Sequence, residues 1–184
     1  MDRTFFQRDT ATVAEDLLGN LLIQEHEGER RGRIVETEAY YGEDDPASHA
    51  SKGRTERNSP MFGQAGRAYI YICYGIHHMF NITTDQKGEP GAVLIRAVEP
   101  LDGIDTMRDR RGIDTKEQLC NGPGKLCEAF DITEQHSGTD VTGGALRIEE
   151  DSEPESIVES PRIGVSEGKE RELRFYVNGS SFVS

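Results

Sequence analysis

The chain has 184 residues, a length at which a single hydrophobic core is the usual organisation. It carries 34 acidic and 21 basic side chains, for a formal net charge of −13. This balance argues against a generic nucleic-acid-binding protein, because phosphates attract Lys and Arg. Its three cysteines match no disulfide framework, and no segment has the length and apolarity of a signal peptide or a bilayer span. We therefore expect a soluble, cytoplasmic protein.

The first predicted element is a surface helix. A capping box over residues 12–15 is followed by apolar residues at helical spacing, and Gly19 marks the expected end. Short runs of apolar, β-branched and aromatic residues then predict strands over residues 21–24, 33–41, 68–74 and 93–98.

Two prolines and an acidic segment organise the second half. We expect Pro100 to introduce a helix that ends near Met107, and Pro123 to occupy the first position of another. Residues 149–160 hold six acidic and no basic side chains and are predicted to form a solvated loop, and residues 173–177 alternate as a final strand. Because strands and helices interleave without a βαβ rhythm, we expect an α+β fold: a single compact domain over residues 1–184, with a mixed, mostly antiparallel curved sheet and flanking helices.

Two carboxylates and an aromatic ring share one face of the strand over residues 33–41. Alternation places Glu36, Glu38 and Tyr40 together, which is poor core composition because burying an unpaired charge is costly. A solvent-facing sheet edge would explain the pattern. So would a general base beside a stacking platform, or a pair of acids for glycosidic-bond hydrolysis.

The strand over residues 68–74 is rich in tyrosine. Tyr69 and Tyr71 share a face, whereas Tyr74 stands at the strand end, where a side chain can project. Residues 51–81 contain four basic groups and one acidic group, among them Arg54 and Arg57. Aromatic faces beside cations suit an extruded or single-stranded nucleotide, although a tyrosine-rich strand is also common in ordinary half-buried sheets.

Metal and phosphate motifs are weak in this chain. His77 and His78 are adjacent, and adjacent residues of an extended chain point to opposite faces, so they cannot easily bind one ion and we expect no metal. Residues 122–126 lack the spacing of a nucleotide-binding loop. Lys125, close to a predicted helix start, is still a candidate contact for one phosphate.

Several motifs occur together in a fixed order. They are residues 34–40 (IVETEAY), His49, residues 57–58 and 61–62, residues 69–75 (YIYICYG), 81–82, 93–97 (VLIRA), 99–101, 119–127 (LCNGPGKLC), 162–165 (RIGV) and 173–177 (LRFYV). In these motifs the chain resembles the alkyladenine (3-methyladenine) DNA glycosylases, base-excision enzymes of the methylpurine type. The resemblance extends over nearly the whole chain.

The resemblance implies catalytic roles for three residues. Glu38 matches the general base that activates a water to attack the sugar C1′ atom. Arg96 matches the arginine that helps to hold this water, and the main-chain carbonyl of Val165 matches a third position implicated there.

The resemblance also implies a base pocket and a DNA wedge. Tyr40, His49 and Tyr71 match the walls that sandwich the extruded base, and Asn81 matches the residue that crowds the 2-position of the purine. Tyr74 matches the side chain that fills the space the base has left.

Taken together, the resemblance predicts a monofunctional glycosylase without metal or cofactor. Its expected partner is double-stranded DNA containing alkylated or deaminated purines, and we expect a monomer. Two other functions are compatible with the residues: a catalytically silent module that binds damaged nucleotides, and a nucleosidase-type glycosidase that uses Glu36 and Glu38 on free substrates.

Overall fold

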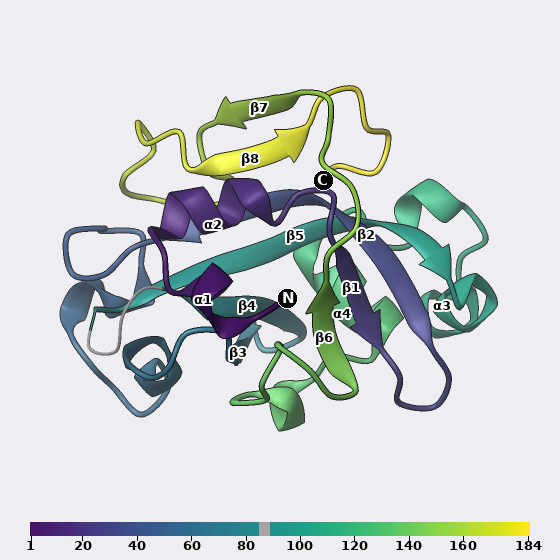
Figure 1. Ribbon diagram of the computed structural model, residues 1–184, viewed down its shortest axis with the longest axis horizontal. Helices are drawn as coiled ribbons and strands as arrows, with labels where there is room; N and C mark the ends of the chain where they lie inside the picture. Colours follow the sequence, from purple (N-terminus) through teal and green to yellow (C-terminus); the bar gives the residue numbers. More distant parts are fainter. Residues whose placement is uncertain (85–88) are drawn as a thin grey trace.

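The computed structural model describes residues 1–84 and 89–184, and within them one curled sheet organises the molecule (Figure 1). Every pairing between its strands is antiparallel, and the main path runs β3-β4-β5-β2-β1-β6, with β8 between β2 and β7. The strands are β1 (Leu21–Gln24), β2 (Arg30–Tyr40), β3 (Ala68–Cys73), β4 (His77–Thr84), β5 (Gly91–Asp102), β6 (Leu146–Glu149), β7 (Ile157–Ser160) and β8 (Arg174–Val177).

Four short α-helices flank this sheet in the described residues. α2 lies across β2 and β5, where the Thr37 hydroxyl donates a hydrogen bond to the Ala14 carbonyl (2.7 Å). α3 and α4 pack on each other, and α4 also packs on β4 and β5. The helices are α1 (Arg3–Phe6), α2 (Thr10–Asp16), α3 (Ile104–Arg111) and α4 (Pro123–Phe130), with short 3-10 turns at His49–Lys52, Ser59–Phe62, Lys116–Gln118 and Glu134–His136.

The two faces of the sheet have different roles. Alternate residues of β3, β4 and β5, such as Ile70, Phe80 and Ile95, enter the main hydrophobic core with α2 and α4. The residues between them, including Tyr69 and Ala92, form a smaller cluster on the opposite face. The fold is thus a single compact α+β domain, as predicted, with one face left for a site.

Several predicted boundaries were wrong. Asp9, not a capping box at residues 12–15, caps α2, because its carboxylate accepts hydrogen bonds from the N–H groups of Ala11 and Thr12 (both 3.1 Å). β5 continues through Pro100 to Asp102, so the helix expected from Pro100 begins only at Ile104. Proline is tolerated there because β4 pairs with β5 only at residues 91–94, which leaves this end of β5 close to a sheet edge.

The acidic segment is also not entirely a loop. β7 occupies its last four residues and pairs with β8, with Ile157 opposite Val177. Two further strands, β4 and β6, were not predicted. Both strands form through pairing with other strands of the sheet, which their own short sequences do not specify.

Candidate active site

One face of four neighbouring strands carries the predicted site residues. Tyr69 pairs with Asn81, Asn81 with Leu94, and Leu94 with Glu38. Directly paired residues of antiparallel strands point to the same side, so this face continues from β3 to β2. Residues two positions along on the same face are Tyr71, Ala92 and Tyr40.

Arg96 lies on the same face two residues beyond Leu94, at a β-bulge. Thr37 pairs with Ile95 and Glu36 with Ala97, so Arg96 has no partner in the register between them. Bulges beside active sites re-aim a side chain. Here the guanidinium of Arg96 lies between the two carboxylates of β2, with Nε 2.9 Å from Glu36 Oε1 and Nη1 3.2 Å from Glu38 Oε2.

Glu38 is fully buried and held by three donors. The Tyr40 hydroxyl donates to Oε2 at 2.8 Å, beside the guanidinium of Arg96. The backbone N–H of Ile163 donates to Oε1 at 2.7 Å. Burial raises the pKa of Glu38 and Glu36 adds to the rise, although Arg96, Ile163 and Tyr40 act in the opposite direction. A buried carboxylate with a raised pKa is suited to general-base chemistry near neutral pH.

A small aromatic pocket lies beside this carboxylate. Its volume is about 20 Å³, and Tyr40 both lines it and bonds to Glu38. The rings of His49 and Tyr71 are in edge contact, with centroids 4.5 Å apart and planes at 68°. A flat base stacked between two rings needs them roughly 7 Å apart, so no base fits between His49 and Tyr71 in this arrangement. The lining residues are Tyr40, Ala47, His49, Met61, Tyr69, Tyr71, Asn81 and Ala92.

His49 reaches the pocket from a loop that side chains fix in place. Its Nδ1 lies 2.9 Å from the Tyr69 hydroxyl. The buried amide of Asn58 donates to the carbonyls of His49 and Gly53 (2.8 and 2.9 Å). Burial lowers the pKa of His49, with a further contribution from Arg57, which favours the neutral ring.

Asn81 forms a rigid part of the pocket wall. It is almost fully buried, and its amide nitrogen donates to the carbonyls of Tyr69 and Met79, both at 3.2 Å. Because both bonds are to the backbone, the side chain has little freedom to move away from a bound base.

A buried ion pair supports the opposite wall. Both oxygens of Asp45 accept hydrogen bonds from Arg162 (2.6 and 2.8 Å), and both side chains are fully buried. Arg162 also lies over the Tyr40 ring, 4.7 Å from its centroid. The next residue, Ile163, donates to Glu38. Sequence reasoning did not assign Asp45 or Arg162 to the site, and only the position of Arg162 in the RIGV motif offered a signal.

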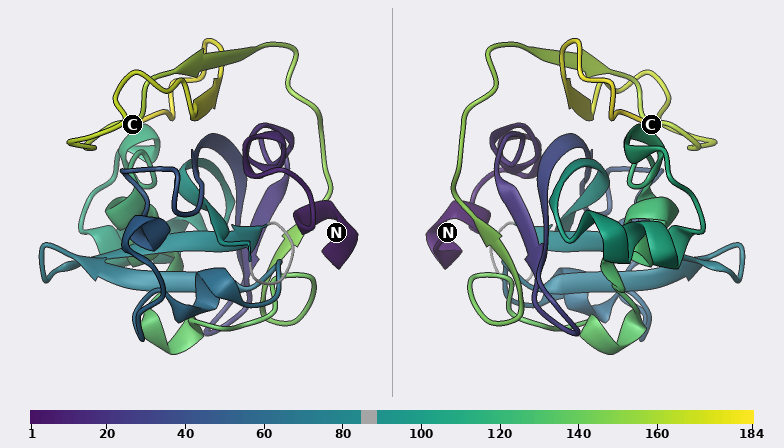
Figure 2. Two further views of the ribbon diagram at one scale, coloured as in Figure 1. Left: turned by 90° about the vertical axis from the view of Figure 1, so that its left-hand side faces the viewer. Right: turned by 90° about the vertical axis from the view of Figure 1, so that its right-hand side faces the viewer.

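Tyr74 occupies a strained turn at the tip of the β3–β4 ribbon, which projects from one side of the molecule (Figure 2). It lies just beyond β3, not at its last position as expected, and has φ +51°. Gly75 follows at φ +76°, so the pair forms a type I′ turn. Left-handed backbone is unfavourable for a tyrosine and is a feature of functional turns. The side chain is 89% exposed and that of Ile76 73%, so two large apolar groups face solvent together.

Two of the three cations predicted to contact DNA, Arg57 and Lys125, lie near this tip. Arg54, Arg57 and Lys125 are exposed, and among residues 1–84 and 89–184 none has a carboxylate partner. Arg57 donates to the Ile72 carbonyl (3.1 Å) and lies over the Tyr71 ring (5.0 Å), so it also supports the pocket. The Lys125 ammonium donates to the neutral side chain of Asn121 at 2.8 Å, and the preceding residue, Gly124, is where α4 meets His77.

Val165 lies outside this set of contacts. It is half-buried, two residues beyond Ile163. The segment reaches Glu38 through the N–H of Ile163, and the predicted role of the Val165 carbonyl stays a prediction.

The comparisons with known proteins agree with this geometry. The family model described as methylpurine-DNA glycosylase matches residues 4–181. The chain belongs to the methylpurine-DNA glycosylase family. A relative from Methanoculleus marisnigri, named "Putative 3-methyladenine DNA glycosylase", is 46% identical over 98% of this chain and 96% of its own. Relatives with the same name from Carboxydothermus hydrogenoformans (44%; 100% and 98%) and Methanocella arvoryzae (46%; 100% and 95%) are similar over the full chain.

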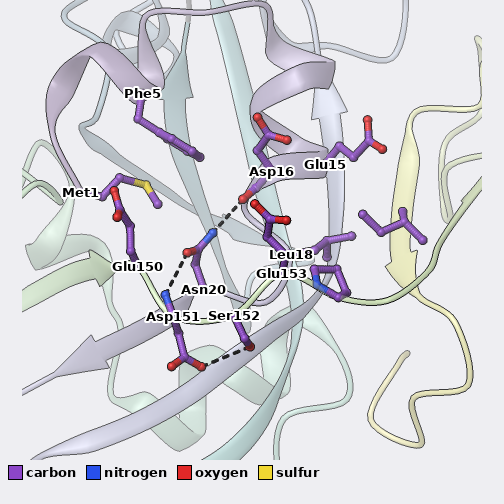
Figure 3. A pocket seen from close by; sticks show the side chains of 12 residues that line it. Met1, Phe5, Glu15, Asp16, Leu18, Asn20, Glu150, Asp151, Ser152 and Glu153 are labelled. Carbon is purple, nitrogen blue, oxygen red and sulfur yellow. Dashed lines mark hydrogen bonds between the residues drawn. The ribbon is translucent and has the colours of Figure 1, made fainter.

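A surface cavity larger than the aromatic pocket lies on another part of this glycosylase-family chain. It has a volume of about 470 Å³ and lies between α1, α2 and residues 150–154 (Figure 3). Its rim includes Glu15, Asp16, Glu150 and Glu153, and such a concentration of carboxylates repels phosphate. Size therefore does not identify the DNA site.

Metal ligation has little support in the described part of the chain. There, possible ligand atoms converge only at His26, Glu27 and Asp131. Arg110 already forms ion pairs with both of these carboxylates, at 3.1 and 2.8 Å. The described residues also include no helix with the length and apolarity of a membrane span.

Proposed function

We propose that this protein is a monofunctional DNA glycosylase that removes alkylated or deaminated purines from double-stranded DNA by hydrolysis of the N-glycosidic bond. The observation that carries the proposal is the position of Glu38. The buried carboxylate is bonded to Tyr40, which is itself a wall of the aromatic pocket. A base held in this pocket would bring its sugar close to the carboxylate.

The first step is extrusion of the damaged nucleotide. A glycosidic bond inside a duplex is inaccessible, so the nucleotide must flip out at a cost of a few kcal/mol. Tyr74 is exposed on a projecting turn and can fill the space left in the stack, which offsets part of this cost. Arg54, Arg57 and Lys125 are available to contact phosphates on either side.

The second step is hydrolysis. Tyr40, His49 and Tyr71 stack on the base, while ionised Glu38 takes a proton from a water that attacks C1′. Its negative charge also stabilises the cationic character that develops on the sugar. Arg96 and the Val165 carbonyl are proposed to orient the water. Among the described residues no lysine lines the pocket, which favours water over an amine as the nucleophile.

Asn81 is proposed to select among purines. Guanine differs from hypoxanthine only by its 2-amino group, which face-to-face stacking cannot recognise. A rigid side chain at that edge can exclude the amino group by steric contact. We further propose that the protein acts as a monomer on chromosomal DNA in the cytoplasm, without metal or cofactor.

An excision assay tests this function. Purified protein is incubated with a duplex containing hypoxanthine or an alkylated adenine, and alkali then cleaves any abasic sites. We expect cleavage at the lesion and none in the undamaged duplex. Binding without excision would instead indicate a silent damage-binding module. Activity on free nucleosides without activity on duplex DNA would indicate a nucleosidase.

A further inference from the structure

Glu36 lies two residues before Glu38 and is saturated with hydrogen-bond donors. Oε1 accepts from Arg174 Nε (2.6 Å), Arg96 Nε (2.9 Å) and the Ser184 hydroxyl (2.9 Å). Oε2 accepts from the backbone N–H of Ser184 at 2.6 Å. The side chain is fully buried and does not line the aromatic pocket. Glu36 is therefore poorly placed to act as a base.

Arg96 connects this carboxylate to Glu38. Its Nε is committed to Glu36, its Nη2 donates to the Ser184 hydroxyl at 3.0 Å, and only Nη1 approaches Glu38. A guanidinium is planar, so fixing two of its nitrogens fixes the direction of the third. Arg96 lies in a bulge and has no cross-strand partner, so its backbone position alone does not fix the direction of its guanidinium.

The charges of the cluster of four side chains linked through Arg96 and Glu36 sum to zero. Glu36 and Glu38 are negative and Arg96 and Arg174 are positive, so the net charge is zero when both carboxylates are ionised. Burial alone would raise the pKa of Glu36, but the Ser184 N–H and the two arginines lower it overall. The pKa of Glu38 is instead raised. Two carboxylates on the same strand thus differ in their readiness to accept a proton.

We propose that Glu36 is a positioning residue of the glycosylase reaction: it aims Arg96 at Glu38 and offsets the positive charge that would otherwise weaken Glu38 as a base. The inference rests on the proposed function. In this proposal Glu36, Arg174 and Ser184 do not contact the attacking water. They hold Arg96 in position, and Arg96 contacts Glu38, the proposed base.

Other groups also face Glu38 and share its environment. Tyr40 donates from β2, and Ile163 donates from the segment before β8. The guanidinium of Arg162 and the charge of Glu38 attract each other, and the charge of Glu38 also contributes to raising the pKa of Tyr71 on β3. None of these groups contacts Glu36, so a change at Glu36 leaves them in place.

Two variants with opposite charge changes test the proposal. Glu36→Gln gives the cluster a net charge of +1, which favours ionised Glu38 and moves the acid limb of the rate profile to lower pH. Arg174→Gln gives a net charge of −1 and moves the limb to higher pH. Single-turnover excision is measured between pH 4.5 and 8.5 under conditions in which the lesion duplex is saturating. The matched control is Asp16→Asn at the end of α2, which removes the charge of an exposed carboxylate that pairs with Arg8.

We expect the ratio of the rate at pH 5 to that at pH 8 to rise about threefold or more in Glu36→Gln, to fall by a similar factor in Arg174→Gln, and to be unchanged in Asp16→Asn. If Glu36 and Arg174 only supported the fold, the variants would excise more slowly at every pH, and the acid limb of the rate profile would stay at the same pH. Unmoved limbs, or limbs that move in the same direction, would overturn the inference. If Glu36→Gln does not fold, the direction of the Arg174→Gln shift decides. Absence of excision by the wild type would instead refute the proposed function.

Discussion

The buried pair of Asp45 and Arg162 offers a quantitative test of how the site is supported. Asp45→Asn preserves the shape of the side chain and removes its charge. The variant keeps Arg162 fully buried without its counter-ion, and one of the two charge-assisted hydrogen bonds is lost because an amide presents only one acceptor oxygen. Removing one partner of a buried ion pair costs about 3–5 kcal/mol, because an uncompensated charge is left in the interior.

The cost should depend on pH. Burial acts to raise the pKa of Asp45, but Arg162 and the N–H groups of Tyr41 and Ala47 lower it overall. A carboxyl whose pKa is lowered by folding stabilises the native state above its unfolded pKa, and this contribution is lost as the pH falls through the folded value. The difference between wild type and variant should thus be full at pH 7 and shrink below about pH 4.

Urea unfolding followed by circular dichroism measures this difference. Asp131→Asn is the matched control, because its pair with Arg110 is about one-third exposed and should contribute less than about 1 kcal/mol. The double variant Asp45→Asn/Arg162→Met should recover much of the loss, since it removes the uncompensated charge. A loss below about 1 kcal/mol in Asp45→Asn at pH 7, or no recovery in the double variant, would refute the reasoning.

Three further predictions concern DNA. Tyr74→Ala should reduce excision more for well-paired lesions than for mismatched ones, because pairing raises the cost of flipping; single-turnover rates on matched duplexes check this, and equal losses would make Tyr74 a surface residue only. Asn81→Ala should raise the single-turnover excision rate of guanine relative to that of hypoxanthine about tenfold. An unchanged ratio of the two rates would show that Asn81 does not exclude guanine. Arg54→Ala should weaken binding to every duplex alike and reduce the salt slope of a binding titration by about one, whereas sequence-dependent losses would contradict a phosphate contact.

Local signals predicted the elements that local chemistry determines. β1 has the predicted bounds, and α4 begins at Pro123 as expected, because proline has no N–H to lose at that position. β4 was missed because its sequence, HHMFNITT, begins with two histidines and lacks a clear apolar alternation. It becomes a strand through pairing with β3 and β5, and no local signal contains that information.

The site shows the same division. Alternation along β2 placed Glu36, Glu38 and Tyr40 on one face, and the resemblance supplied roles for residues on other strands. The supporting contacts were not predictable, because they join residues far apart in the sequence. Asp45 meets Arg162 across 117 positions and Glu36 meets Ser184 across 148. Such contacts depend on the closed fold, and spacing along the chain does not encode them.

Replacement of Glu38 by Gln tests the central claim most directly. The variant retains the shape of the side chain and loses the proton acceptor, so lesion binding should persist while excision falls. General-base loss reduces rates by about 10²–10⁴. The measurement pairs single-turnover excision of hypoxanthine with binding of the same duplex, for Glu38→Gln and wild type at pH 7.5. The account predicts a rate loss of at least about a hundredfold with affinity within a few-fold of wild type, and near-normal excision by Glu38→Gln would contradict it.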